Sequence, residues 1–172
     1  VSANSRVAQI SRVVETLSRA WGSPVNGSLR YSFPAPSDLG CASETDVLAC
    51  KAGFRSRSIC EAAAKVARGQ LDLDAVAAMD YHAAKQELML LRGVGEKVAD
   101  CVLLFSMGKF EAFPVDVWIE RAVRHLFFGG ERVPHREIRQ WAAANFGELA
   151  GYAQEYLFAY ARMAIPEKLR NG

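Results

Sequence analysis

The chain has 172 residues, of which 51% are apolar, and its 21 basic and 19 acidic side chains leave a formal net charge of +2. Such a chain is too apolar to be disordered and is long enough for one domain, or two small ones, with a buried core. No apolar run reaches the ~18 residues of a membrane span, and no secretory signal is visible at the start. Because the charge is only mildly basic, a nucleic-acid contact would depend on local placement of groups and on backbone N–H donors.

Apolar residues recur at helical spacing along nearly the whole chain. Residues 23–40 are rich in proline, glycine and serine and are expected to form a loop with at most one short turn. No long stretch alternates in the way a strand requires, so the pattern predicts an all-α fold of about eight helices. We expect helices over residues 7–21, 44–51, 56–68, 81–91, 97–107, 117–128, 135–145 and 151–163, with caps at Ser56 or Ser58, Asp72, Asp74, Asp80 and Asp116.

The four cysteines are Cys41, Cys50, Cys60 and Cys101. Their spacing matches no zinc site and no iron–sulfur cluster. We expect each to be a small, buried or half-buried thiol, which suits a reducing compartment.

The most informative segment covers residues 91–101 and contains a glycine hairpin over residues 92–96. Gly93 and Gly95 flank Val94, and glycines permit positive φ and close approach of another backbone. Since a helix follows at once, its free N–H groups and positive dipole end would form an anion site, with a phosphate diester as the natural occupant. The alternative is an ordinary turn between two helices. Lys97, which opens the second helix, favours the anion site.

This hairpin, together with Pro114-Val115-Asp116, resembles the helix-hairpin-helix DNA glycosylase superfamily. The closer match is the 8-oxoguanine DNA glycosylase branch, in which Gly-Val-Gly-x-Lys-Val-Ala-Asp-Cys recurs. The resemblance extends over nearly the whole chain. Further segments that match in order and spacing are Asn4 with Val7-Ala8, Gly53-Phe54-Arg55-Ser56-Arg57, and Ala153-Gln154-Glu155-Tyr156-Leu157-Phe158.

The resemblance implies that residues 1–172 are the helical region of a glycosylase, with the hairpin and catalytic motif over residues 81–128. The β-rich domain that usually precedes this region in the family is absent from the sequence. We therefore expect the chain to be part of a longer or cleaved protein.

By resemblance, the activity is that of a bifunctional DNA N-glycosylase and AP lyase that removes oxidised guanine. Lys97 would attack the sugar, form a Schiff base and allow strand nicking by β-elimination. Asp116 would stabilise the positive charge that builds on C1′ while also capping its helix. An ordinary lysine, with a pKa of about 10.4, is protonated at neutral pH, so Lys97 needs a special environment to attack. The alternatives are a solvated surface lysine and a plain helix cap.

The same resemblance implies a pocket for a base that leaves the DNA stack. Phe158 and Cys101 would sandwich the base, and Gln154 would hydrogen-bond its Watson–Crick edge. The alternative for Phe158 is an ordinary core position.

Three further residues are expected to contact DNA by family position, besides Gly93 and Gly95. Asn4 would fill the space that the flipped nucleotide leaves, Phe54 would wedge beside the partner base, and Arg55 would hydrogen-bond that base. The alternatives are a helix cap for Asn4 and a phosphate contact or a surface charge for Arg55.

Several positions depart from the family pattern. Gln9 stands where eukaryotic members have an arginine that reads the partner cytosine, and Phe54 replaces a tyrosine. Losing a bidentate arginine weakens discrimination by ~1–3 kcal/mol, so we expect a looser preference for the partner base. Trp118 stands where animal enzymes have a histidine, and the sequence assigns it no role.

The family also implies a structural cation, monovalent or alkaline-earth, held by hairpin carbonyls that correspond to those of Met89, Leu91 and Val94. No other cofactor is expected. The expected partner is damaged double-stranded DNA, with no membrane contact, and the protein is expected to be a monomer. The expected compartment is the cytoplasm and nucleoid of a bacterium, or the nucleus of a eukaryote.

Four rival functions remain open. A glycosylase for alkylated bases usually lacks the hairpin lysine, and one for oxidised pyrimidines typically has a C-terminal cysteine cluster, whereas this chain has no cysteine after Cys101. A DNA-binding hairpin module without catalysis would form no covalent adduct. A helical interaction domain unrelated to DNA would show no salt-dependent binding to a duplex.

Overall fold

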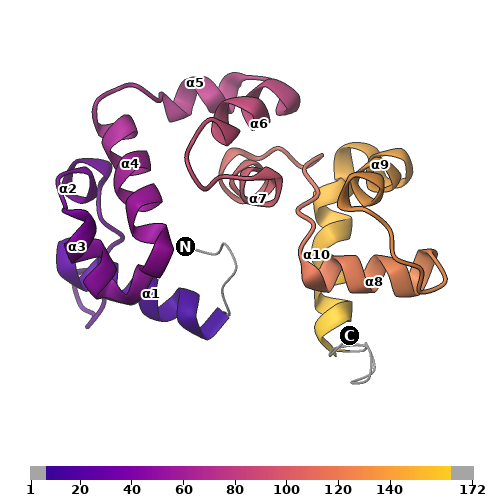
Figure 1. The fold of residues 1–172 in the computed structure, drawn as a ribbon, viewed down its shortest axis with the longest axis horizontal. Helices are drawn as coiled ribbons and strands as arrows, with labels where there is room; N and C mark the ends of the chain where they lie inside the picture. The colour runs from indigo at the N-terminus through magenta and orange to yellow at the C-terminus, as the bar shows by residue number, and fades with distance from the viewer. Residues whose placement is uncertain (1–6, 164–172) are drawn as a thin grey trace. The chain divides into compact units, whose positions relative to one another are not determined.

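The computed structural model describes residues 7–163. The regular secondary structure of these residues is almost entirely helical (Figure 1), and their β pairing consists of an isolated bridge between Pro24 and Tyr31. The all-α prediction is therefore confirmed. The helices are α1 (Val7–Trp21), α2 (Pro36–Gly40), α3 (Glu44–Val47), α4 (Ser56–Ala67), α5 (Leu73–Ala78), α6 (Tyr81–Met89), α7 (Glu96–Met107), α8 (Val117–Phe127), α9 (His135–Phe146) and α10 (Ala150–Met163).

Two compact units make up the chain. The first comprises the described residues up to Ala78 together with Glu87–Val94. The second comprises Met79–Gln86 and the described residues from Gly95 onward. The region that the sequence predicts as one helical body thus contains two units, each with its own core.

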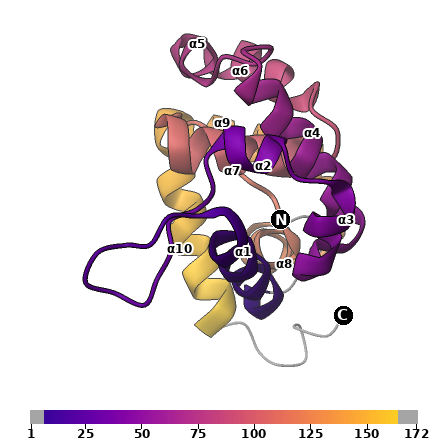
Figure 2. The same ribbon diagram turned by 90° about the vertical axis from the view of Figure 1, so that its left-hand side faces the viewer.

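In the first unit, α2 and α3 lie beside α4 (Figures 1 and 2). The approach of α2 to α4 is close because Gly40 has no side chain: a Cβ there would lie 3.0 Å from the Cα of Ala64. Apolar residues of α1 and of the segment that follows α3 complete the core. Its buried members are Val13, Leu17, Leu39, Val47, Cys50 and Ala52.

In the second unit, α8 packs against α10, and α9 covers both. Phe113 is 2% exposed and is the largest fully buried side chain, and burying such a residue contributes roughly 1.5–3 kcal/mol. Trp141 on α9 joins the core to three phenylalanine rings, with centroid distances of 4.5 Å to Phe127, 5.9 Å to Phe128 and 5.3 Å to Phe146. This core holds α8 and α10 in place. Asp116 caps α8, and α10 carries Gln154 and Phe158.

Several predicted caps are present. Asp72 accepts the N–H groups of Asp74 and Ala75, and Asp80 accepts those of His82 and Ala83. The prediction of a serine cap for α4 is wrong. The N-cap position is Arg55, and the Ser56 hydroxyl instead donates to the Gly53 carbonyl at 2.7 Å.

Two segments differ from the predicted pattern. The region 23–40, expected to be a loop with at most a short turn, contains the short helix α2, which begins with Pro36 at its first position. The sequence predicts a single helix over residues 44–51. The structure instead has the short helix α3, which ends at Val47, followed by a π-helical turn, Leu48–Ala52. Within residues 7–163, no helix has both the length and the apolar character that crossing a bilayer demands.

Candidate active site

The second unit contains a cleft of about 280 Å³. Its walls come from α7, from the segment before α8, and from α10. Five residues that the sequence predicts for the site meet there, namely two on α7, the residue that caps α8 and two on α10. The complete lining is Lys97, Cys101, Phe105, Pro114, Asp116, Gln154, Glu155 and Phe158.

Helix α7 contributes one face to the cleft. Lys97, Cys101 and Phe105 are spaced by four residues, so they form a single stripe along the helix. Gly95 is the N-cap and has no side chain with which to cap the helix, and the first helical bond runs from the Ala99 N–H to the Gly95 carbonyl at 2.9 Å. The N–H groups of the first turn therefore lack helical acceptors, and they lie beside Lys97.

Cys101 lies one turn after Lys97 and is half-buried. Burial raises the pKa of its thiol, and the neighbouring Lys97 amine, which is within hydrogen-bonding range of the sulfur, opposes that shift. The side chain is therefore a neutral, polarisable thiol at physiological pH, which suits a surface that contacts a flat ring.

Asp116 is the N-cap of α8, as predicted. Its Oδ1 accepts the N–H of Trp118 at 2.9 Å and that of Ile119 at 3.0 Å. Both cap bonds use the same oxygen and fix the orientation of the carboxylate. The side chain can therefore cap the helix and face the cleft at the same time.

Helix α10 supplies the polar end of the cleft and an aromatic face. Gln154 is 5% exposed, and its Oε1 has no hydrogen-bond partner within the described residues. Leaving a buried amide oxygen unpaired costs about 1–3 kcal/mol, so this acceptor is suited to a donor brought by a ligand. Phe158 lies one turn later, is half-buried, and has the Arg162 guanidinium 5.7 Å from its ring centroid.

Sequence reasoning missed three residues of the lining, Phe105, Pro114 and Glu155. Phe105 is 63% exposed and stands four residues after Cys101. Extending the Lys97–Cys101 spacing by one more helical turn finds it. No comparable spacing identifies Glu155, because its place in the cleft depends on how α10 packs.

The first unit carries Phe54 and Arg55, on a strained segment after the π-helical turn. Lys51 has a positive φ of 62°, which is the one such non-glycine residue in the described chain, and Gly53 has a φ of 61°. Phe54 is 72% exposed, whereas Arg55 is only 7% exposed. The Arg55 guanidinium lies 4.4 Å from the Phe54 ring centroid and donates to the Ala52 carbonyl at 3.3 Å. An exposed aromatic side chain is thus supported by a buried cation.

The two hairpin glycines, Gly93 and Gly95, differ in backbone conformation and in the space around them. Gly93 has a φ of 77°, and a Cβ there would lie 2.7 Å from the Ser58 hydroxyl oxygen, so the fold itself demands glycine. Gly95 has an extended backbone with φ of −98°, and a Cβ there would meet no described atom within 4 Å. The described chain therefore leaves open space beside the backbone at position 95.

The remaining predicted residues are the three carbonyl groups expected to bind a cation, and Asn4. The carbonyl of Leu91 accepts the Val94 N–H at 3.1 Å, which leaves its second lone pair for another contact. The carbonyl donors of Met89, Leu91 and Val94 are hard oxygens, as a monovalent or alkaline-earth cation requires. Asn4 lies outside the described residues.

The chain belongs to the HhH-GPD superfamily of base excision DNA repair proteins, whose family model matches residues 1–146. Among curated relatives it is 35% identical to a probable N-glycosylase/DNA lyase of Methanothermobacter thermautotrophicus, with 99% of this chain and 61% of that protein aligned.

Two solved structures are also similar. An 8-oxoguanine glycosylase/lyase of Clostridium acetobutylicum, in complex with double-stranded DNA containing cytosine opposite 8-oxoguanine, gives a TM-score of 0.88 at 36% identity, with 94% of this chain and 56% of that one covered. MBOgg1, in complex with a low-affinity DNA ligand, gives a TM-score of 0.90 at 39% identity over the same shares. The chain therefore spans little more than half the length of these solved relatives.

Proposed function

We propose that this chain is the catalytic helical region of a bifunctional DNA N-glycosylase and AP lyase that removes oxidised guanine from double-stranded DNA. The observation that carries the proposal is the shared cleft: an amine, Lys97, and a carboxylate, Asp116, line one cavity with an aromatic ring and an unpaired buried amide oxygen. The names of the similar proteins, which are N-glycosylase/DNA lyases and 8-oxoguanine glycosylase/lyases, support the same activity.

The reaction begins when the neutral Lys97 amine attacks C1′ of the deoxyribose. The bond to the base breaks, and the base leaves with the bonding electrons and takes up a proton. Positive charge builds on the sugar as this happens, and the Asp116 carboxylate stabilises it, an effect commonly worth ~100- to 1,000-fold in rate.

The attached nitrogen then loses a proton. The C1′–O4′ bond breaks and O4′ takes up a proton, so the sugar ring opens and leaves a Schiff base between Lys97 and C1′. Loss of a C2′ proton expels the 3′ phosphate and nicks the strand. Water hydrolyses the imine and restores Lys97. Each step uses only the chain, the nucleotide and water.

Recognition of the base would use the far end of the cleft. Guanine and 8-oxoguanine carry two N–H donors on the Watson–Crick edge, N1–H and the 2-amino group, and the unpaired Oε1 of Gln154 is an acceptor suited to them. Phe158 offers one ring face and Cys101 the opposite contact.

Contacts to the duplex would come from the hairpin and from the first unit. A phosphate would approach the backbone at Gly95 and the first-turn N–H groups of α7. Phe54 would wedge into the stack and Arg55 would act on the partner base, with Asn4 in the vacated space. A cation held by the carbonyls of Met89, Leu91 and Val94 would stabilise the hairpin without joining the chemistry. The protein would act as a monomer where the chromosome lies, in the nucleoid or the nucleus.

Borohydride trapping tests the proposal. The wild-type protein should form a covalent adduct with a duplex containing 8-oxoguanine, and Lys97→Gln should form none while still binding the duplex, because the hairpin is unchanged. Duplexes with an oxidised pyrimidine or an alkylated purine serve as comparison substrates. Absence of any adduct with the wild-type protein would leave a binding module, and preference for an alkylated purine would overturn the substrate.

A further inference from the structure

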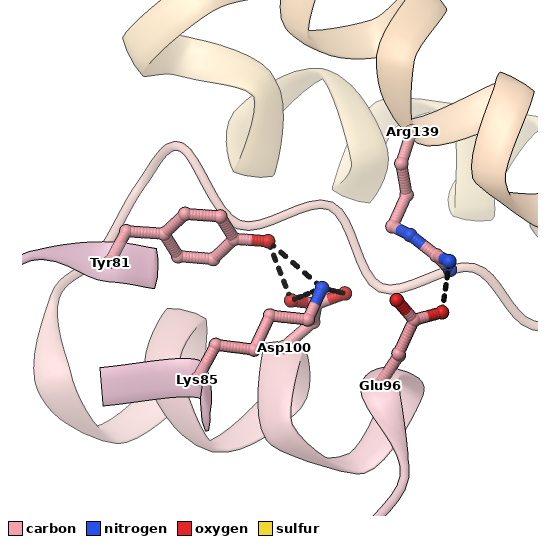
Figure 3. Close-up of polar contacts among 5 residues, drawn as sticks. All are labelled: Tyr81, Lys85, Glu96, Asp100 and Arg139. Carbon is pink, nitrogen blue, oxygen red and sulfur yellow. Dashed lines mark hydrogen bonds and ion pairs between the residues drawn. The ribbon is translucent and has the colours of Figure 1, made fainter. Parts of the chain in front are cut away.

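A buried polar network lies on α6 and α7 and takes no part in the chemistry above (Figure 3). Lys85 Nζ is 2.8 Å from Asp100 Oδ1 and 3.0 Å from Oδ2, so the ammonium bridges both carboxylate oxygens. The Tyr81 hydroxyl donates to Asp100 Oδ1 at 2.8 Å, and Lys85 also donates to the Tyr81 oxygen at 3.2 Å. The side chains of Lys85 and Asp100 are 10% and 0% exposed.

Stability is a weak reason for a buried ion pair. Removing two charges from water costs about as much as their attraction returns, so an apolar replacement of the whole pair is often neutral or stabilising. Burial accordingly raises the pKa of the Asp100 carboxyl, although Lys85 and Tyr81 oppose the shift. The position of the pair next to the cleft offers a functional reason.

Helix α7 carries two adjacent stripes. Lys97 and Cys101 belong to the stripe that lines the cleft, while Glu96 and Asp100 form the neighbouring stripe. Asp100 follows Lys97 by three positions, a spacing at which helix side chains are neighbours and readily form ion pairs. An amine that pairs with a buried carboxylate is held in its protonated form and turned away from its target.

Both acidic residues of the second stripe already have cationic partners. Lys85 binds Asp100, and Arg139 from α9 forms an ion pair with Glu96 (Figure 3). Each carboxylate therefore already has a counterion other than Lys97, which lies between them in the sequence and faces the cleft.

We propose that Lys85 is a positioning residue that occupies the Asp100 carboxylate and thereby leaves the Lys97 amine directed into the cleft; this rests on the proposed lyase function of Lys97. Asp100 also joins the first turn of α6 to α7 through the Tyr81 hydroxyl, and Asp100→Asn keeps this bond because its Oδ1 still accepts. Asp100 thus links α7 to α6, and Lys85 is the counterion that prevents the Asp100 carboxylate from pairing with Lys97.

Other charged or titratable groups lie near Lys97, and the variants of the test leave them in place. The groups come from α7 itself, from the cap of α8, from α9 and from α10. They are Glu96, Cys101, Asp116, Arg139 and Glu155.

The test is the pH dependence of Schiff-base formation in three variants, measured under single-turnover conditions from about pH 6 to about pH 10. Lys85→Met keeps the apolar stem but exposes Asp100 to Lys97. Its acidic limb should move up by about one pH unit, which is a ~10-fold lower rate at neutral pH, with the rate at high pH retained. Asp100→Asn should show no upward movement, and the double variant Lys85→Met with Asp100→Asn should return to within about 3-fold of the wild-type rate.

Lys109→Met is the matched control, because it removes a lysine of the same unit that donates to the Met79 carbonyl and not to Asp100. Its profile should match that of the wild-type protein. An unchanged Lys85→Met profile, or a double variant as slow as Lys85→Met, overturns the proposal. If Lys85→Met fails to fold, Asp100→Asn and the double variant decide, and a 10-fold loss in either refutes it. A wild-type protein that forms no adduct refutes the lyase function instead.

Discussion

Replacing Asp116 by asparagine separates the two roles that one side chain holds. The cap of α8 rests on Oδ1, which accepts two N–H groups at 2.9 and 3.0 Å. Asparagine retains an oxygen in that place and caps helices about as well as aspartate, so the free energy of unfolding should change by less than about 0.5 kcal/mol. The charge is lost, so the single-turnover rate of base excision should fall ~100- to 1,000-fold, or about 2.7–4 kcal/mol in activation free energy.

Asp116→Ala removes both functions. It should show the same fall in rate and, in addition, lose the cap, which costs about 1 kcal/mol, or ~2–4 °C in melting temperature for a chain of this size. Asp80 supplies the matched control, because it caps α6 with bonds of 2.9 and 3.0 Å to the His82 and Ala83 N–H groups and does not line the cleft. Asp80→Asn should leave both rate and melting temperature unchanged.

The assay pairs thermal denaturation with excision of 8-oxoguanine at enzyme excess. Near-normal excision by Asp116→Asn would show that the carboxylate charge plays no part in the chemistry. A melting temperature that falls as far for Asp116→Asn as for Asp116→Ala would refute the cap argument, since the oxygen acceptor is then irrelevant.

Three further predictions concern single residues. Gly151→Ala should lower the free energy of unfolding by about 1–2 kcal/mol. Its Cβ would lie 2.3 Å from Leu104 Cδ1 and 2.9 Å from the Phe110 carbonyl, and this overpacking outweighs the gain of about 1 kcal/mol in helix propensity. Denaturant melts that show a more stable variant would contradict this prediction. Gly95→Ala should cost at most about 1 kcal/mol in stability, as a cap change, yet weaken duplex binding by about 10-fold, because a Cβ there meets only an approaching phosphate; equal affinity in a titration at fixed salt would remove the phosphate argument. Cys101 has a raised thiol pKa, so it carries less thiolate at pH 8 than an ordinary cysteine and should react more slowly with iodoacetamide, as mass spectrometry of tryptic peptides can measure; alkylation at the rate of a free thiol would argue against its burial.

Much of the fold follows from local signals. The helix boundaries at Gly22, Asp80 and Asp116 rest on interactions within three or four residues, so spacing and caps were sufficient to predict them. The short helix α2 was missed because prolines usually end helices. Pro36 instead occupies the first helical position, where its missing N–H has no helical partner to lose.

Some features of the candidate site also follow from local sequence signals, whereas others depend on packing. Lys97 and Cys101 share a helical face, and their spacing shows this directly. Burial is different: no spacing rule showed that Arg55 would be buried, with its guanidinium over the Phe54 ring and bonded to the Ala52 carbonyl. The ion pair of Lys85 with Asp100 was not predicted either, since periodicity tells which side of a helix is buried and not which charge it meets there.

By itself, then, the order of residues determined the helical class, the glycine hairpin and the presence of an amine and a carboxylate near helix starts, because each depends on neighbours along the chain. Only the packing of α8 and α10 around Phe113 decided that Asp116 and Gln154 face the same cleft as Lys97. Convergence of distant side chains depends on how whole helices fit together, and no pattern within one segment contains that information.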